Sequence, residues 1–369
     1  MSAHLCLLGD ATSVHLRRWA GEMLARGFRV SVVTARPEPM AGVEQRVLQP
    51  VKRSTDWLWR VGQARRHVGE LAPDIVHAHY VTSYGYLAAR CGRHPLVMTA
   101  WGSDILVTPH NNRWVSWLTG WALRRADLIT GDSVDLLERV AEFGPRAPVR
   151  QVHWGADMAR FQPAVWSAKQ GFQIVSLRAW EANYNIDVIV QAVALLHQRL
   201  PDAGVHLHLL GGGPGEAGLR AQAQSLGLLN HVSFHGRVGD VAMVDVLQAC
   251  KVSVSVPTSD ATSVSVLESM ACGLPVVASD LPANRQWLAA EEGVLVHAPG
   301  STALAVALAA SLAAALEALC RDDARAQRIG QANHDRMLRE GARSVQMDAM
   351  AALYRALPKR APRGAGGPA

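Results

Sequence analysis

Two carboxylates, Asp260 and Glu268, lie eight positions apart in the stretch SDATSVSVLES, which follows a predicted β-strand. Asp260 falls in the loop after the strand, and Glu268 falls inside a helix that Thr262 or Ser263 would cap. The first amides of a helix have no acceptor within it and can bind an anion, about one turn from Glu268. A ligand with a phosphate group between two hydroxyl-bearing ends fits this layout, and a nucleotide sugar has that form. A capped helix with one solvated glutamate is the alternative that the spacing leaves open.

A glycine-rich loop, GGGPGEAG at residues 211–218, follows another predicted strand. Gly213, Gly215 and Gly218 match the G-x-G-x-x-G pattern of dinucleotide-binding loops. That pattern needs an acidic residue on the next strand to hold a ribose, and HVSFHG at 231–236 has none. An NAD-dependent oxidoreductase is therefore not expected. The glycines are expected to make a tight turn or to let the backbone approach a ligand.

A third loop, GDATSVH at residues 9–15, joins the first predicted strand to a helix. The amides near Ser13 and Val14 lie at the start of that helix and could face an anion. His15 is ambiguous, because a structural or capping role and a ligand-binding role are equally compatible with its position.

Short apolar runs alternate with helical patterns along most of the chain. The runs form two series, at 4–10, 28–34, 74–79, 95–100, 126–132 and 149–154, and then at 172–177, 205–211, 231–236, 251–257, 275–279 and 293–298. Strands that alternate with helices predict parallel sheets covered on both faces. A pattern-poor stretch at 161–171 separates the two series. We therefore expect an α/β fold with two Rossmann-like, doubly wound domains that bind ligands at the carboxyl ends of their strands.

The composition is that of a folded protein with an uneven charge. Of 369 residues, 49% are hydrophobic and 18% are charged, which argues against bulk disorder and for two domains. The net charge of +6 lies entirely in residues 1–163. This excess favours a negatively charged partner, such as an anionic membrane or a phosphorylated acceptor, although a merely basic surface is equally compatible. No nucleic-acid partner is expected.

Five scattered cysteines without a CxxC pair predict reduced thiols in a cytoplasmic protein rather than a zinc site. The N-terminus lacks a basic segment before its apolar run, so no signal peptide is expected. The apolar stretch 303–320 contains Glu317 and leads into charged residues, which indicates a helix of a soluble protein rather than a membrane span.

Several of these segments together resemble the retaining glycosyltransferases of family 4, which have the GT-B fold. The family signature is E-x7-E followed by an AMACGxPVV run, and this chain has Asp260-x7-Glu268 within DATSVSVLESMACGLPVV. VSLRAW, GGGP and FHGRV, at 175–180, 211–214 and 234–238, resemble the family's strand-end loops. VHWGADMARFQP (152–163) resembles its domain-joining segment, and TAWGSD (99–104) resembles its acceptor-side motif, with Trp101 in place of the usual histidine.

The resemblance implies a donor site in the C-terminal half. Glu268 would bind the donor ribose, Asp260 the transferred sugar, and Arg178 the diphosphate. The lysine that usually follows this arginine in the family is missing, and Tyr184 and Asn185 lie nearby in the sequence. The other expected donor contacts lie in strand-end loops and at helix starts: Ser13, Val14, Asn185, Gly212, Gly213, Arg237, Val238, Thr262, Ser263 and Val264. Charge stabilisation of the leaving diphosphate would come from Arg178 and helix-start amides, so neither a metal nor another cofactor is expected beside the nucleotide-sugar co-substrate.

The acceptor side is expected in the N-terminal half, at His15, Trp101, Gly102 and His153. Asp104 is expected as a catalytic base or as the holder of the acceptor hydroxyl, with a loop cap as the alternative. The departing phosphate could take the acceptor proton instead. His79 and His153, at strand ends, are more often structural histidines than catalysts.

Trp114, Trp117 and Trp121 have helical spacing in RWVSWLTGWALRR (113–125), with arginines at both ends. Tryptophan beside arginine suits a membrane interface, and the segment VKRSTDWLWR (51–60) is of the same kind. Contact with an anionic membrane near a lipid-linked acceptor and packing into the domain core both remain open.

The expected division is an acceptor-side domain at 1–163, a donor domain at 164–340, a C-terminal helix at 341–357 that packs back toward the first domain, and a disordered tail at 358–369. We expect a cytoplasmic enzyme, which would be peripheral to the inner face of the plasma membrane if the tryptophans meet lipid. It would move a sugar from a UDP-sugar, or from a GDP-sugar, to a glycan or lipid-linked acceptor in the synthesis of a cell-surface polysaccharide or glycolipid. A GT-B-fold sugar-nucleotide epimerase and a non-catalytic nucleotide-sugar-binding protein are the alternatives.

Overall fold

The computed structural model describes residues 2–288, 293–296 and 302–358 and divides into two compact units. One unit runs to His153 and takes in the chain again from Gln346, and the other is Trp154–Val345. The expected boundary after residue 163 is therefore displaced. Ala156 forms a parallel bridge with Ala342, and Phe161 is buried in the core of the second unit, so the joining segment belongs to that unit. Most of the expected tail, from residue 359, lies outside the described residues.

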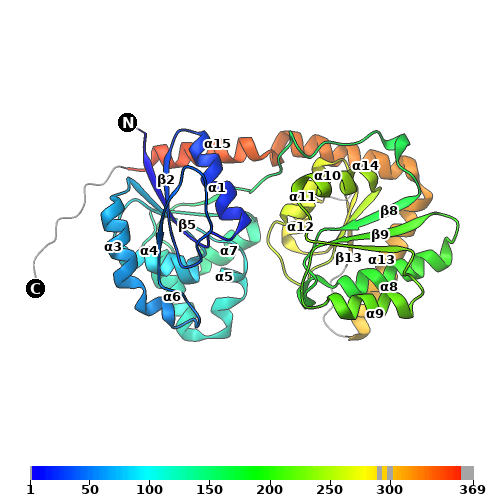
Figure 1. Ribbon diagram of the computed structural model, residues 1–369, viewed down its shortest axis with the longest axis horizontal. Coiled ribbons are helices and arrows are strands. Elements are labelled where there is room, and N and C mark those ends of the chain that lie inside the picture. The colour runs from blue at the N-terminus through cyan, green and yellow to red at the C-terminus, as the bar shows by residue number, and fades with distance from the viewer. Residues whose placement is uncertain (1, 289–292, 297–301, 359–369) are drawn as a thin grey trace, which may run out of the picture. The chain divides into compact units, whose positions relative to one another are not determined.

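The first unit has a seven-stranded parallel sheet in the order β3-β2-β1-β4-β5-β6-β7 (Figure 1). Its strands are β1 (His4–Leu8), β2 (Arg29–Thr34), β3 (Glu44–Val47), β4 (Ile75–His79), β5 (Leu96–Thr99), β6 (Leu128–Gly131) and β7 (Val149–Gln151). The sequence predicts all of these except β3. That strand, EQRV, lies at the edge of the sheet and has no buried residue, so it carries no apolar signal.

Helices cover both faces of this sheet (Figure 1). They are α1 (Val14–Ala25), α2 (Asp56–Trp59), α3 (Val61–Leu71), α4 (Tyr86–Cys91), α5 (Ser103–Leu106), α6 (Arg113–Leu123) and α7 (Val134–Glu142). The long helix α15 (Arg343–Ala356) brings the end of the chain back to this unit.

The second unit has a six-stranded parallel sheet in the order β10-β9-β8-β11-β12-β13. Its strands are β8 (Phe172–Ser176), β9 (Val205–Leu210), β10 (Val232–Gly236), β11 (Val252–Ser255), β12 (Val276–Ser279) and β13 (Val294–Val296). Its helices are α8 (Ile186–Arg199), α9 (Glu216–Ser225), α10 (Asp240–Ala249), α11 (Val264–Ala271), α12 (Pro282–Trp287), α13 (Thr302–Arg321) and α14 (Asp323–Arg336). The order reverses between β8 and β11, which are neighbours in the sheet.

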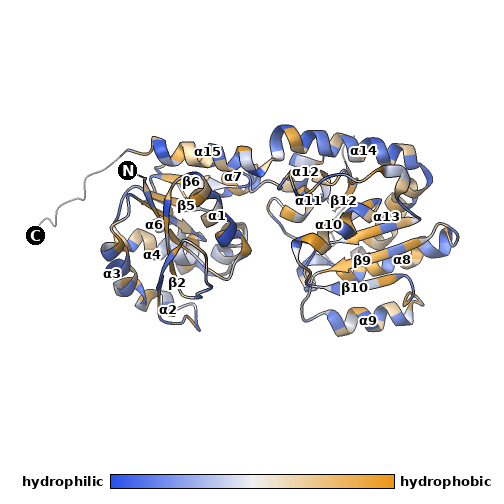
Figure 2. Cartoon of the chain, turned by 45° about the horizontal axis from the view of Figure 1, so that its top comes forward, coloured by the Kyte–Doolittle hydropathy of each residue, from blue (hydrophilic) through white to orange (hydrophobic). Residues whose placement is uncertain are grey.

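Alternating side chains of the second sheet enter two cores. Ile174 and Leu207 pack with helices α8 and α13, whereas Val175 and Leu210 pack on the opposite face with Leu267 of α11. Burial of each such side chain stabilises the fold by about 1.5–3 kcal/mol. Figure 2 shows the apolar residues on strands such as β9 and the polar residues along helices such as α3. The predicted fold class, two doubly wound α/β domains, is confirmed.

The helix expected at 303–320 is α13 (Thr302–Arg321), and its buried leucines pack on the sheet with α8. No helix in the described part of the chain is long and apolar enough to cross a membrane.

The returning helix α15 is fastened to the first sheet by one buried tyrosine. The Tyr354 hydroxyl accepts a hydrogen bond from Trp19 Nε1 at 3.0 Å and lies 2.5 Å from Nδ1 of His77 on β4. His77 Nε2 lies 2.7 Å from the Thr99 hydroxyl, so the chain of hydrogen bonds continues through the buried sheet. Burial raises the pKa of Tyr354 and lowers the pKa of His77 well below its usual value, so both groups are uncharged at neutral pH.

Replacing Tyr354 by phenylalanine is expected to lower the free energy of unfolding by about 1–3 kcal/mol, because the Trp19 and His77 ring nitrogens lose their buried partner. Denaturant unfolding followed by tryptophan fluorescence measures this change. Tyr86→Phe is the matched control, since Tyr86 is half-buried and its hydroxyl makes no hydrogen bond within the described residues. Equal effects of the two substitutions would contradict the role given to Tyr354.

Candidate functional site

The first candidate site lies in the second unit, where β8 and β11 are neighbours and the strand order reverses. Ligands of doubly wound sheets bind at this position. Arg178 follows β8, and Asp260 lies in the loop between β11 and α11. Nη2 of Arg178 donates a hydrogen bond to Oδ2 of Asp260 at 2.6 Å. Two residues that the sequence assigns to catalysis therefore contact each other.

Arg178 is held on several sides and is 9% exposed. Nη1 donates to the hydroxyls of Ser263 and Ser265, the latter at 3.1 Å. The guanidinium lies over the Tyr184 ring, 4.3 Å from its centroid. Nε has no hydrogen-bond partner among the described residues, so a buried donor remains for a ligand. Ser265 and Tyr184 are missing from the predicted site, because their spacing from Arg178 in the sequence carries no signal.

Asp260 compensates the buried guanidinium. Burial raises the pKa of Asp260, and the adjacent Arg178 opposes that shift. An arginine–carboxylate pair at this depth is stable only when its donors and acceptors are also hydrogen-bonded, as the serine contacts of Arg178 provide. Asp260 is thus part of the support of Arg178 as well as a candidate contact for a sugar.

Helix α11 begins beside this pair. Ser263 is the N-cap residue, yet its hydroxyl contacts Arg178 and Ser265 instead of capping the helix. The first amides of α11, from Val264, have no acceptor within the helix and bring its positive end to the guanidinium. Thr262 and Glu268 are both buried, and Glu268 lies further along α11. The arrangement suits a bound diphosphate with a hydroxyl-bearing group nearby.

The glycine-rich loop packs on the segment that carries Arg178. Gly211 has φ 152°, and a Cβ there would lie 2.3 Å from the Arg178 carbonyl oxygen. A Cβ on Gly213 would lie 2.6 Å from the Trp180 carbonyl oxygen, and Trp180 N–H donates to the Gly212 oxygen at 3.2 Å. The glycines therefore allow two loops to approach each other, which is a packing role rather than a dinucleotide-binding one.

Three further predicted donor residues lie around these loops. The Arg237 side chain runs beside Gly212, where an added Cβ would be 3.4 Å from its Cγ. Val238 is half-buried against the core behind α11. Asn185 is committed to the fold, because its side-chain amide donates to the Val256 oxygen at 2.8 Å and to the Thr258 hydroxyl at 3.2 Å.

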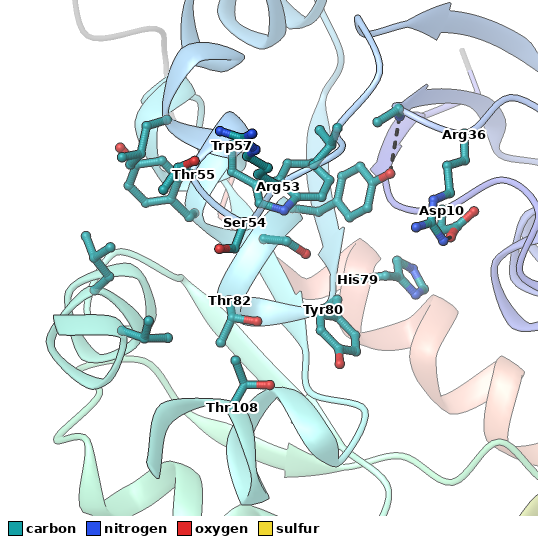
Figure 3. A pocket seen from close by; sticks show the side chains of 18 of the residues that line it. Asp10, Arg36, Arg53, Ser54, Thr55, Trp57, His79, Tyr80, Thr82 and Thr108 are labelled. Atoms are coloured by element: carbon teal, nitrogen blue, oxygen red, sulfur yellow. Dashed lines mark hydrogen bonds and ion pairs between the residues drawn. The ribbon is translucent and has the colours of Figure 1, made fainter. Parts of the chain in front are cut away.

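The second candidate site is a cavity of about 810 Å³ in the first unit, at the carboxyl ends of its strands (Figure 3). Ser13 and His15 line it from the start of α1, and Trp101 lines it from the loop after β5. The His15 and Trp101 rings are 5.1 Å apart, and Trp101 stacks on His79 at 5.6 Å. The structure therefore brings these expected residues together and adds His79.

Two other predicted residues of this unit shape the loops. Val14 is 45% exposed and does not line the cavity, and Gly102 is buried with φ 112°, a conformation that favours glycine. The residues next to them in the chain, Ser13, His15 and Trp101, line the cavity instead.

Asp104 holds a loop together. It is fully buried, Oδ2 accepts from Val81 N–H at 2.7 Å, and Oδ1 accepts from Trp101 N–H at 2.9 Å. Burial raises the pKa of Asp104 to about 6, while its backbone hydrogen bonds act in the opposite direction. Asp104 is not among the residues that line the cavity, so this geometry favours the loop cap over a catalytic base.

His153 also has structural partners. Its Nδ1 lies 2.8 Å from the Asp132 carbonyl oxygen, and its backbone N–H donates to Gln346 Oε1 at 3.1 Å. These contacts place it with the structural histidines that the sequence leaves as an alternative.

The tryptophans of α6 have different environments. Trp114 and Trp117 are 60% and 52% exposed and stack on each other at 5.1 Å. Trp121 is half-buried, 5.8 Å from the Tyr86 ring and under the Arg125 guanidinium. Packing of the whole row into the core is therefore wrong, since only Trp121 faces inward.

No group of three or more His, Cys, Asp or Glu side chains is placed to hold a metal ion in the described residues. All five cysteines are free, and three of them are buried.

Comparison of the sequence with known protein families finds one match in each unit. Residues 4–133 match the family described as glycosyl transferase 4-like, and residues 159–336 match glycosyl transferases group 1. The chain belongs to the family 4 glycosyltransferases. Over 370 aligned residues it is 25% identical to EpsD of Bacillus subtilis, a protein named as a candidate glycosyltransferase, covering 92% of this chain and 91% of the relative. It is 38% identical over 126 residues to the phosphatidyl-myo-inositol mannosyltransferase of Mycobacterium leprae, covering 34% of this chain and 31% of that one.

Solved glycosyltransferase structures share the fold. The sucrose-phosphate synthase of Thermosynechococcus elongatus aligns with a TM-score of 0.79 at 18% identity, over 96% of this chain and 98% of its own. Anabaena HepE in complex with UDP-glucose aligns with a TM-score of 0.78 at 17% identity, over 96% of this chain and all of its own. This glycosyltransferase therefore has the GT-B fold.

His79 makes the stability of the enzyme depend on pH. Burial, with a smaller contribution from His15, lowers the pKa of His79 to about 3, below its value of about 6.5 in an unfolded chain. The unfolded chain binds the proton first, so stability is complete above pH 6.5 and falls as the pH drops toward 3. Asp104 has the opposite effect, because its pKa is raised in the folded protein. As the pH falls from about 6 to 4, protonation of Asp104 increases the free energy of unfolding.

The contribution of His79 is therefore expected in the difference between the wild type and His79→Gln. As the pH falls from 6.5 to 4, the free energy of unfolding of the wild type should fall relative to the variant by about 1.4 kcal/mol per pH unit. Urea unfolding at a series of pH values measures it. A difference that does not change with pH would show that His79 is not buried in its neutral form.

Proposed function

We propose that this glycosyltransferase takes a nucleoside diphosphate sugar, with a UDP-sugar favoured over a GDP-sugar, and transfers the sugar with retention of configuration. The observation that carries the proposal is the buried Arg178 guanidinium, fixed beside the start of α11 with Nε unbonded among the described residues. Solved structures of HepE hold UDP and UDP-glucose on the same fold, which supports this class of donor.

Each residue of the site has a role in this proposal. Arg178 and the α11 amides at Ser263 and Val264 bind the diphosphate, with Thr262 beside them. Glu268 accepts hydrogen bonds from the donor ribose, and Asp260 contacts the transferred sugar while it supports Arg178. Arg237 and Val238 lie toward the base, with Gly212 and Gly213 forming the adjacent loop.

The reaction breaks the bond between the anomeric carbon and the diphosphate oxygen and forms a bond from that carbon to an acceptor oxygen. The proton of the acceptor hydroxyl passes to the departing phosphate oxygen on the same face of the sugar, so retention requires no base on the opposite face. Negative charge grows on the diphosphate as the bond breaks, and the guanidinium with the helix amides stabilises it. This chemistry requires no metal ion.

The proposed acceptor is a glycan or a lipid-linked molecule in the synthesis of a cell-surface polysaccharide or glycolipid. We also propose that the protein is cytoplasmic and that α6 makes peripheral contact with an anionic membrane. The exposed pair Trp114 and Trp117 supports that contact, and flotation with anionic vesicles tests it.

Two other functions share parts of this site. A sugar-nucleotide epimerase of this fold would use the donor site alone, and the large second cavity, lined by aromatic and hydroxyl side chains, favours transfer to an acceptor. A non-catalytic sugar-nucleotide binder would keep its ligand without turning it over.

A thermal-shift panel of UDP, GDP, ADP and CMP and their sugars tests the donor site. The preferred nucleotide at 100 times its Kd should stabilise the protein by about 2.7 kcal/mol by mass action. Arg178→Ala should lose this shift, while Arg199→Ala, which removes an exposed arginine from the far end of α8, should keep it. If no nucleotide raises the melting temperature of the wild type, the proposed donor site is wrong.

Turnover of the preferred donor without acceptor separates the three functions. Proton NMR should show slow hydrolysis that first releases the anomer present in the donor, and Asp260→Asn should slow it by at least about a hundredfold, within the range for loss of one charge-stabilising group. Glu268→Gln should weaken donor binding. A second nucleotide sugar in the spectrum would indicate an epimerase, the opposite anomer would exclude retention, and an unchanged donor would favour a binding protein.

A further inference from the structure

The cavity of the first unit combines three kinds of surface that a plain sugar site does not need. Figure 3 shows Arg53 and Trp57 on one side and Asp10 and Arg36 on another, with His79 and Tyr80 between them in this view. Its walls come from the strand ends, from the segment 51–58 and from the start of α6. Each part favours a different chemical group.

The inner part is polar and offers hydrogen bonds to a hydroxyl-bearing group. His79 is 5% exposed, lines the cavity, and neither ring nitrogen has a hydrogen-bond partner among the described residues. Its low pKa, about 3, keeps the imidazole neutral, so one nitrogen can accept a hydrogen bond and the other can donate one. Tyr80, Thr82 and Thr108 also line the cavity, and the Tyr80 hydroxyl lies 2.6 Å from the Ser103 hydroxyl.

A second part of the wall is cationic. Arg36 is paired with Asp10 at 3.1 Å, but the side chains of Lys52 and Arg53 make no ion pair or hydrogen bond within the described part of the chain. The nearby Asp56 carboxylate accepts the backbone N–H groups of Lys52 and Arg53, at 2.8 and 2.9 Å. Arg53 also attracts this carboxylate electrostatically, without a close ion pair. Two cations in one short loop match a phosphate or diphosphate group.

The third part is apolar and continues out of the cavity. Trp57, Leu58, Trp114, Val115 and Leu118 line it, and Trp57 packs on Tyr84 at 4.8 Å. Trp114 also belongs to the exposed stack with Trp117, so the apolar wall reaches the surface of the protein. A volume of about 810 Å³ holds a headgroup and the beginning of a chain, and a longer chain would leave along these tryptophans.

We propose that the acceptor is a lipid phosphate, an apolar chain joined through a phosphate or diphosphate to a hydroxyl-bearing group. Lys52 and Arg53 bind the phosphate, Trp57, Leu58 and Trp114 bind the chain, and the part of the cavity around His79 receives the hydroxyl-bearing group. This assignment rests on the proposed transfer function and names the acceptor class for its second site.

Binding of small lipid phosphates to the full-length protein tests the proposal without any need for turnover. Farnesyl phosphate and dihexanoyl phosphatidic acid, each below its micellar concentration, represent isoprenoid and acyl chains. Farnesol lacks the phosphate, and inorganic phosphate lacks the chain. Isothermal titration should show that at least one lipid phosphate binds more than about tenfold tighter than farnesol and than inorganic phosphate, a difference that corresponds to loss of one charge-assisted contact.

Matched variants locate the site. Lys52→Ala/Arg53→Ala should weaken the lipid phosphate by at least about tenfold, and Trp114→Ala should weaken it without a change in UDP binding. Arg65→Ala/Arg66→Ala removes the same charge from exposed positions on α3, outside the cavity wall, and should change the affinity less than about twofold. Melting temperatures of all three variants check that they are folded.

Two results would overturn the proposal. One is farnesol binding as tightly as both lipid phosphates, and the other is equal weakening by the cavity pair and the α3 pair. Tight binding of a soluble, uncharged oligosaccharide in place of the lipid phosphates would also contradict it. The UDP melting shift, measured on the same samples, keeps this failure separate: a retained UDP shift leaves the donor site intact, whereas its absence contradicts the proposed function itself.

Discussion

The second unit of this glycosyltransferase depends on one ion pair, Arg178 with Asp260. A guanidinium that is 9% exposed must have compensating charge and hydrogen-bond acceptors, and Asp260 with the serines at the start of α11 supplies them. The neighbouring loops adapt to the same group: glycines at 211 and 213 let a second loop approach the Arg178–Trp180 backbone, and the Tyr184 ring covers the guanidinium. Because the sheet reverses its strand order at this point, the pair lies where a ligand can reach it.

Most of the fold follows from patterns within short windows of sequence. Apolar strands between amphipathic helices predict two parallel sheets, and twelve of the thirteen strands in the described part of the chain have that signal. β3 lacks it because an edge strand with no buried residue can be polar. Its pairing with β2 rests on the backbone ladder and on an exposed ion pair between Arg29 and Glu44 at 3.4 Å. The resemblance places the joining segment at 152–163, but the division after His153 is not visible in sequence, since it depends on the contact of that segment with residues near 342.

The site was less predictable because its contacts join distant parts of the chain. Spacing identifies Asp260 and Glu268 as candidates, and the family resemblance adds Arg178, but neither shows that Arg178 and Asp260 touch. Asp104 shows the converse: the sequence leaves a catalytic base and a loop cap open, and both carboxylate oxygens accept backbone N–H groups, which favours the cap. His79 was undervalued, since a histidine at a strand end is usually hydrogen-bonded, and only the structure shows two buried nitrogens without partners among the described residues.

The central claim is that the Arg178 guanidinium, held in place by Asp260, binds the donor diphosphate. Affinities of uridine, UMP and UDP for the wild type and for Arg178→Lys, measured by calorimetry, test it most directly. Lysine keeps the charge but loses the planar fork that contacts Asp260 and the serines. The account predicts that Arg178→Lys binds UDP at least about tenfold more weakly than the wild type and binds uridine with unchanged affinity. The increase in affinity from uridine to UDP would then be smaller in the variant. An equal loss for uridine and UDP, or no loss for either, would contradict it.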